Sequence, residues 1–124
     1  MGKYGQTAVL AVQLVQNGKI ENLREAWKIA SKQIFGEWTT SQKKECPKCA
    51  FLGICEEGKV IGILSGEYTT SIKNKGYALK TLELIKKDRS LLNNKNKLWK
   101  QIVDMQEEGQ LDVVISLYNA GLIN

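Results

Sequence analysis

The only proline and all three cysteines of this 124-residue chain lie in one short segment, from Cys46 to Gly58. Proline has no backbone N–H, so it fits the first turn of a helix, where that group would have no partner in any case. A helix that begins near Pro47 would turn four residues towards a core: Ala50, Phe51, Ile54 and Cys55. Because glycine is the residue favoured just after the end of a helix, we expect this helix to stop at Gly58.

Helical periodicity also dominates the rest of the chain. Five stretches repeat apolar residues at intervals of three and four: 8–15, 23–34, 77–85, 98–105 and 111–118. Asn22 and Glu25 have the spacing of a capping box at the start of the second stretch. Gly18 and Gly36 follow the ends of the first two stretches. Together with the helix at Pro47, these patterns predict about six helices.

The segment after Gly58 changes period and predicts a short β-hairpin. Lys59 to Leu64 and Glu67 to Ser71 contain β-branched and aromatic residues, which favour strands. Ser65-Gly66 between them is typical of a tight turn. An internal glycine, Gly62, weakens the first of these strands because it has no side chain to pack.

The fold class that we expect is mainly α, with about six helices and one short β-hairpin in a single compact domain over residues 1–124. Residues 4–71 have the order helix, helix, turn, helix, hairpin, which is that of a winged helix. Residues 72–124 would form a second helical unit packed on the first. A weak internal likeness between residues 8–15 and 78–85 is consistent with a tandem three-helix repeat, and chance similarity between amphipathic helices is the alternative.

Composition indicates an ordinary globular protein of the cytoplasm. The hydrophobic content is 43% and the charged content 25%, as in folded domains. No apolar run approaches the roughly 18 residues of a membrane span, and the first residues lack the pattern of a signal peptide. Three clustered cysteines argue against a secreted disulfide framework. We therefore expect no membrane partner.

The charge is distributed unevenly along the chain. Residues 1–71 carry a net charge of +2, residues 72–100 carry +7, and residues 101–124 carry −4. A basic block beside an acidic tail favours either an anionic partner or pairing within the molecule. A solvated helix face is the simpler alternative.

A winged-helix arrangement would make the helix at Pro47 the recognition helix and the hairpin the wing. The polar and basic residues around both elements are then the candidate nucleic-acid contacts: Gln42, Lys43, Lys44, Lys48, Lys73 and Lys75. The lysines would neutralise phosphates, and Gln42 would meet a base edge. Against this hypothesis, Glu45, Glu56 and Glu57 lie in the same region and no arginine does.

The cysteines allow a metal site or a thiol-redox site as a further alternative. Cys46, Cys49 and Cys55 resemble half of a zinc site, but structural zinc takes four ligands. The chain has no histidine and no fourth cysteine. Cys46 and Cys49 also have dithiol spacing, yet no strand precedes them as the redox motif requires. Structural cysteines are the favoured interpretation, and no metal or cofactor is expected.

Catalytic patterns are scarce, so a binding module is favoured over an enzyme. Without histidine the chain lacks the usual general base and the Ser-His and Cys-His pairs. No glycine-rich phosphate loop is present. Nucleic acid is the leading partner, and another protein or a second copy of the chain is the alternative. That alternative would use the region of Trp38 or the helical second half.

A family resemblance covers most of the chain. The run Cys-Pro-x-x-Ala-Phe-Leu-Gly-Ile-Cys-Glu-x-Gly from Cys46 to Gly58 is its most distinctive part, and the Ala-Trp pair at Trp27 and the Leu-Trp pair at Trp99 add to it. With these motifs the chain resembles an uncharacterised family of small bacterial proteins that carries a domain-of-unknown-function label. The resemblance implies a prokaryotic or phage-type cytosolic protein and supplies no activity and no catalytic residue.

Overall fold

The computed structural model describes residues 2–37 and 39–124 and confirms a mainly helical protein. It contains six α-helices and one 3₁₀ helix: α1 (Lys3–Gln16), α2 (Leu23–Phe35), α3 (Glu45–Glu56), α4 (Ile72–Lys87), η1 (Arg89–Asn93), α5 (Lys95–Lys100) and α6 (Gln110–Asn119). No strand occurs in the described part of the chain. None of the helices there is long and apolar enough to cross a membrane.

Side-chain caps fix where several helices begin. Asn22 accepts a hydrogen bond from the backbone N–H of Glu25 at 3.0 Å, as the sequence predicted for the start of α2. Ser71 and Asn94 cap α4 and α5 in the same way. Such caps satisfy N–H groups that have no partner within the helix. At the other end of α2, Gly36 has a φ of 89°, a backbone conformation that favours glycine.

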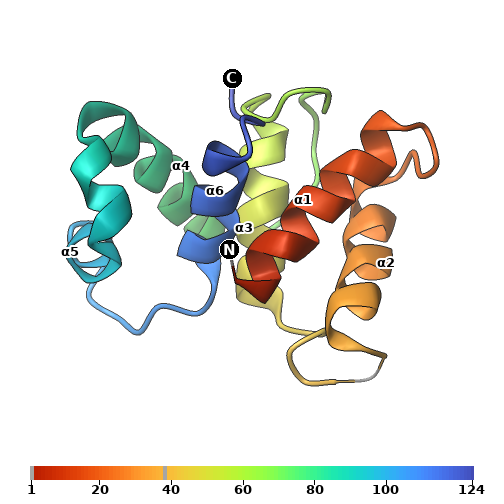
Figure 1. The fold of residues 1–124 in the computed structure, drawn as a ribbon, viewed down its shortest axis with the longest axis horizontal. Helices are drawn as coiled ribbons and strands as arrows, with labels where there is room; N and C mark the ends of the chain where they lie inside the picture. Colours follow the sequence, from red (N-terminus) through yellow and green to blue (C-terminus); the bar gives the residue numbers. More distant parts are fainter. Residues whose placement is uncertain (1, 38) are drawn as a thin grey trace.

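Helix α3 lies at the centre of the molecule. Figure 1 shows α3 and α6 in the middle, with α1 and α2 on one side and α4, η1 and α5 on the other. α3 packs against α4 and α6, and α1 packs against α2 and α6. The four α3 residues predicted to face inward are all fully buried: Ala50, Phe51, Ile54 and Cys55. The ring of Phe51 packs on that of Trp27 in α2 with the ring centroids 5.2 Å apart.

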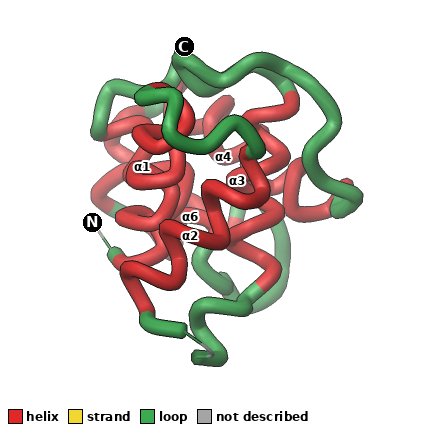
Figure 2. Tube along the Cα trace, turned by 90° about the vertical axis from the view of Figure 1, so that its right-hand side faces the viewer, coloured by secondary structure: helices red, strands yellow, loops and turns green. Residues whose placement is uncertain are grey.

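The predicted β-hairpin is wrong, and the segment between α3 and α4 is an irregular loop. Val60 forms an isolated antiparallel bridge with Ile123, near the C-terminus, instead of pairing with the stretch after the turn. Gly62 has a φ of 84° and interrupts the extended backbone. Figure 2 shows this part of the chain as loop, without a strand. The first expected strand therefore pairs with a residue near the end of the chain and not with the second expected strand.

The second half of this loop is tied to the end of α3 by one carboxylate. Glu56 accepts hydrogen bonds from the backbone N–H groups of Tyr68 and Thr69 at 2.6 and 2.7 Å. Backbone groups that a hairpin would have paired with another strand thus bind a side chain.

The winged-helix prediction is wrong for the same region. A recognition helix must present an exposed face to a groove, whereas seven of the α3 residues are buried: Pro47, Ala50, Phe51, Leu52, Gly53, Ile54 and Cys55. α4 and α6 cover this helix, and the hairpin that would form the wing is absent from the described residues. The structure therefore does not support the winged-helix mode in which α3 would enter a groove of DNA.

Two glycines allow helices to approach closely. A Cβ atom added at Gly53 would lie 2.6 Å from the Cα atom of Lys75, so α3 and α4 touch backbone to backbone. A Cβ atom added at Gly5 would overlap the Ser116 Oγ atom, which places α1 directly on α6. Asp112 reinforces the second contact by accepting hydrogen bonds from the N–H groups of Gly2 and Gly5 at 2.9 and 2.8 Å.

Candidate functional site

Three basic residues form a line along one side of α2. Arg24, Lys28 and Lys32 are spaced by four residues, which places them on the same side of the helix with an advance of about 6 Å at each step. The neighbouring side of α2 carries Ala26 and Trp27 and is buried. The helix therefore inserts its apolar side into the core and presents a row of cations beside it.

This row borders a cleft between α2 and the start of α3, which we call the basic cleft. It has a volume of about 690 Å³ and is lined by Asn22, Arg24, Glu25, Trp27, Lys28, Ser31, Lys32, Gln42, Lys43, Glu45 and Lys48. Five of these residues are basic and two are acidic, a formal net charge of +3. Such a balance attracts anions into the cleft.

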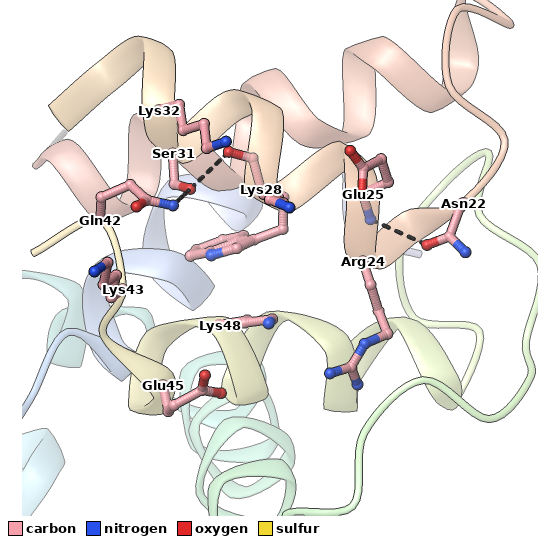
Figure 3. Close-up of a pocket in the computed structure, with 11 residues that line it drawn as sticks. Asn22, Arg24, Glu25, Lys28, Ser31, Lys32, Gln42, Lys43, Glu45 and Lys48 are labelled. Atoms are coloured by element: carbon pink, nitrogen blue, oxygen red, sulfur yellow. Dashed lines mark hydrogen bonds between the residues drawn. The ribbon is translucent and has the colours of Figure 1, made fainter. Parts of the chain in front are cut away.

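Side chains from both helices point into the gap (Figure 3). Lys28 of α2 and Lys48 of α3 lie on opposite sides of it, Arg24 reaches down towards α3, and the Glu25 carboxylate points away from α3. The guanidinium of Arg24 donates to the carbonyl oxygen of Tyr68 at 2.8 Å. Within residues 2–37 and 39–124, neither Lys28 nor Lys48 forms an ion pair. An anion can therefore bind these two ammonium groups without first displacing a carboxylate.

A short polar network holds the loop before α3 against α2. Gln42 donates from Nε2 to the Ser31 hydroxyl at 3.1 Å, and that hydroxyl donates to the carbonyl oxygen of Lys28 at 2.9 Å. The Gln42 backbone N–H in turn donates to the Thr39 hydroxyl at 3.0 Å. Gln42, predicted to contact a base edge, thus lines the cleft with its amide N–H already engaged.

The inner wall of the cleft includes an indole ring. Trp27 is only 2% exposed and contributes to the lining. Its Nε1 atom is buried and has no hydrogen-bond partner among the described residues. Buried polar groups in folded proteins are nearly always hydrogen-bonded, so this donor is an exception, and it belongs to a residue that lines the cleft.

The predicted nucleic-acid contacts divide into two sets. Gln42, Lys43 and Lys48 come together in the basic cleft, whereas the other three lie elsewhere. Lys44 forms an ion pair with Glu108, and its hydrogen bond to that carboxylate raises the pKa of its ammonium group. Lys73 is exposed in the first turn of α4.

Lys75 is engaged at the end of α3. It binds Glu56 at 2.8 Å and Glu57 at 2.6 Å, and the hydrogen bond to Glu56 is the main reason why the pKa of Lys75 is raised. The acidic residues that weakened the sequence hypothesis therefore act, in part, as partners of a predicted site residue.

The structure separates the three cysteines. Cys55 is fully buried, and burial raises the pKa of its thiol far above the usual value. Cys46 and Cys49 are half-buried in the first two turns of α3, and the Cys49 thiol donates to the Glu45 carboxylate at 3.8 Å. No group of three or more potential metal ligands occurs within residues 2–37 and 39–124.

The contribution of α2 to the site was not among the predictions from the sequence. Arg24, Lys28 and Lys32 lie within the stretch that was predicted to be helical, and their spacing of four residues was visible there. What the sequence did not show is that the loop before α3 folds back beside this row. Trp38, the predicted exposed aromatic contact, lies outside the described residues.

A second cleft differs in charge from the first. It has a volume of about 620 Å³ and lies between α5 and the segment that leads into α6. Its charged lining residues are Lys95, Lys100, Asp104, Glu107 and Asp112. With two cations and three carboxylates it has no excess of positive charge, so we take the basic cleft as the candidate site.

Comparison with known proteins identifies the family but no activity. A family model described as "Family of unknown function (DUF6979)" matches residues 1–124. The chain belongs to this family. No curated protein and no solved structure matches it.

Proposed function

We propose that this protein is a non-enzymatic binding module that holds the sugar–phosphate backbone of a nucleic acid in the basic cleft. The observation that carries the proposal is the gathering of five basic side chains in one cleft with only two acidic ones. Lysine and arginine bind nucleic acid mainly by neutralising phosphates and releasing the counterions that surround them. Such contacts position the chain without specifying its sequence.

The size of the cleft favours a single strand over a duplex. A volume of about 690 Å³ is that of a pocket for a small molecule, so a double helix would contact only its rim. One strand presents its phosphates singly and can follow the row Arg24, Lys28 and Lys32 along α2. Lys48, on the opposite side of the gap, would then contact the same strand from α3.

The test is fluorescence anisotropy of a labelled single strand of about a dozen nucleotides, and of the matching duplex, at several salt concentrations. If all five basic residues meet phosphates, log K falls with log salt with a slope of about −3.5, since each contact on a single strand contributes about −0.7. We expect the single strand to bind more tightly than the duplex.

A pair of double variants locates the binding surface. Lys28→Gln with Lys48→Gln removes two phosphate contacts. Relative to about 1 M salt, a slope of about −0.7 per contact gives each contact a factor of about 8 in affinity at 50 mM salt and about 3 at 200 mM. Lys95→Gln with Lys100→Gln removes the same charge from the second cleft and serves as the control. We expect a loss of about 60-fold for the first pair at 50 mM and a much smaller loss for the second.

Two outcomes would overturn the proposal. One is that the wild-type protein binds neither nucleic acid at 50 mM salt, in which case a protein partner becomes the leading hypothesis. The other is that both double variants lose affinity equally, because that result would assign binding to the overall charge and not to the basic cleft.

A further inference from the structure

The indole N–H of Trp27 stands out against the other tryptophan that the structure describes. The Nε1 atom of Trp99 donates to the carbonyl oxygen of Met105 at 2.6 Å. The Nε1 atom of Trp27 is buried but has no acceptor among the described residues. A buried donor without an acceptor destabilises a fold, so its position in the wall of a cleft calls for a physical account.

Packing does not require this N–H group. The ring of Trp27 contacts Phe51 within the continuous apolar core, and a phenylalanine at this position would retain an aromatic ring there. The N–H group adds only a hydrogen-bond donor, and it belongs to a residue that lines the basic cleft, where five side chains are basic and two are acidic. Its useful partner would therefore be an anionic oxygen that enters the cleft from outside.

We infer that Trp27 is a ligand-binding residue and that its indole N–H donates a hydrogen bond to a phosphate oxygen of the strand held in the basic cleft. This inference rests on the proposed function and adds to it a neutral, directional donor at the inner wall. A hydrogen bond in a site of low dielectric is stronger than one at the surface. The lysines at the rim attract the strand, and Trp27 fixes one phosphate at depth.

The donor becomes accessible when the side chains at the cleft move. Trp27 is 2% exposed, so a phosphate reaches its Nε1 atom only after side chains that line the basic cleft move. Lys28 is exposed and Lys48 half-buried, and neither is held by an ion pair within the described part of the chain. Long lysine side chains rearrange readily because their rotamers are many. We expect the arriving strand to draw these two ammonium groups towards its phosphates and so to widen the cleft that Trp27 lines.

Trp27→Phe tests the inference because it removes the donor and keeps an aromatic ring. We expect the affinity for the single strand to fall about tenfold at every salt concentration, as the loss of one hydrogen bond to a charged group implies. The salt slope should stay as in the wild-type protein, since a neutral N–H releases no counterion, whereas Lys48→Gln should lower the slope by about 0.7. Wild-type affinity in Trp27→Phe, alongside a weakened lysine variant, would overturn the inference and leave the proposed function standing. Absence of binding by the wild-type protein would overturn both.

A measurement on the unaltered protein makes the test independent of how the variant folds. The chain has three tryptophans, and each indole gives its own ¹H–¹⁵N resonance. Trp99→Phe and Trp38→Phe assign two of these resonances, and the third belongs to Trp27. We expect the Trp27 resonance to move downfield when the single strand is added, while that of Trp99 stays in place because its donor is already engaged. A shift with inorganic phosphate alone would show that a single phosphate group suffices. A Trp27 resonance that does not move in the saturated complex would overturn the inference.

Discussion

Replacing Glu56 by glutamine tests whether one carboxylate holds the loop between α3 and α4 in place. The Glu56 side chain is 9% exposed and accepts three hydrogen bonds: from the N–H groups of Tyr68 and Thr69 at 2.6 and 2.7 Å and from the Lys75 ammonium at 2.8 Å. Desolvation by burial acts to raise the pKa of this carboxyl, but these donors outweigh it and the pKa is lowered.

The size of the effect follows from these contacts. Glutamine at position 56 keeps the shape and one acceptor oxygen but turns an N–H₂ group towards donors that had an oxygen before it. Losing hydrogen bonds to a charged, mostly buried group costs about 1–3 kcal/mol. For a chain of 124 residues the unfolding entropy is about 0.26 kcal/mol per kelvin. We therefore expect the melting temperature of Glu56→Gln to fall by about 4–12 °C at pH 7.

The assay is thermal and urea unfolding followed by circular dichroism, with Glu57→Gln as the matched control. Glu57 also binds Lys75, at 2.6 Å, but its side chain is 46% exposed. Exposed ion pairs contribute about 1 kcal/mol or less, so this variant should remain close to the wild-type protein. Equal destabilisation by the two substitutions would refute the assignment of the anchoring role to Glu56.

The pH dependence gives a second check on the same carboxylate. Because the pKa of Glu56 is lower in the folded protein than in the unfolded chain, its ionised form contributes stability that is fully present above the unfolded pKa of about 4.3. That stability is lost as the pH falls through the folded pKa. The difference between the wild-type protein and Glu56→Gln should therefore be largest at neutral pH and shrink in acid. A difference that stays constant down to strongly acidic pH would contradict the reasoning.

Two further predictions concern packing and thiol accessibility. Gly53→Ala should destabilise the protein by about 1–3 kcal/mol in urea unfolding, because the added Cβ atom would overlap the α4 backbone. Gly76→Ala is the control: its Cβ atom would meet nothing within 4 Å, so this variant should be about 0.5–1 kcal/mol more stable than the wild-type protein. The reverse order of stabilities would refute the close contact between α3 and α4. In the native protein a thiol reagent should modify the half-buried Cys46 and Cys49 and spare Cys55, which is fully buried. The Cys55 thiol should react only in denaturant. Equal modification rates for all three thiols in the native protein would contradict this burial.

The helices could be predicted because their determinants are local. Apolar spacing located α2, the Asn22 cap fixed its start, and Pro47 with Gly58 bounded most of α3. The β-hairpin failed because the partner of Val60 is Ile123, a residue far along the chain that no local pattern reveals. The loop instead takes its shape from that distant bridge and from the carboxylate at the end of α3.

The candidate site could be predicted only in part for a similar reason. Gln42, Lys43 and Lys48 are close in sequence and remain close in the fold. The partner of Lys44 is Glu108 in the segment before α6, so its engagement could not be seen in the sequence. The basic row on α2 was visible, but its role depends on how α2 packs beside α3, which is a tertiary property.

The hydrogen bonds between the start of α1 and Asp112 in α6 have a consequence for how the protein is made. Asp112 lies 110 residues after Gly2 and 107 after Gly5, and α1 packs on α6 as well as on α2. A ribosome that adds about 5–20 residues per second needs roughly 5–20 s to synthesise the chain between these partners. A nascent chain that ends before α6 therefore leaves the α6-facing side of α1 uncovered. We expect such a stalled or truncated product to be recognised by chaperones and proteases.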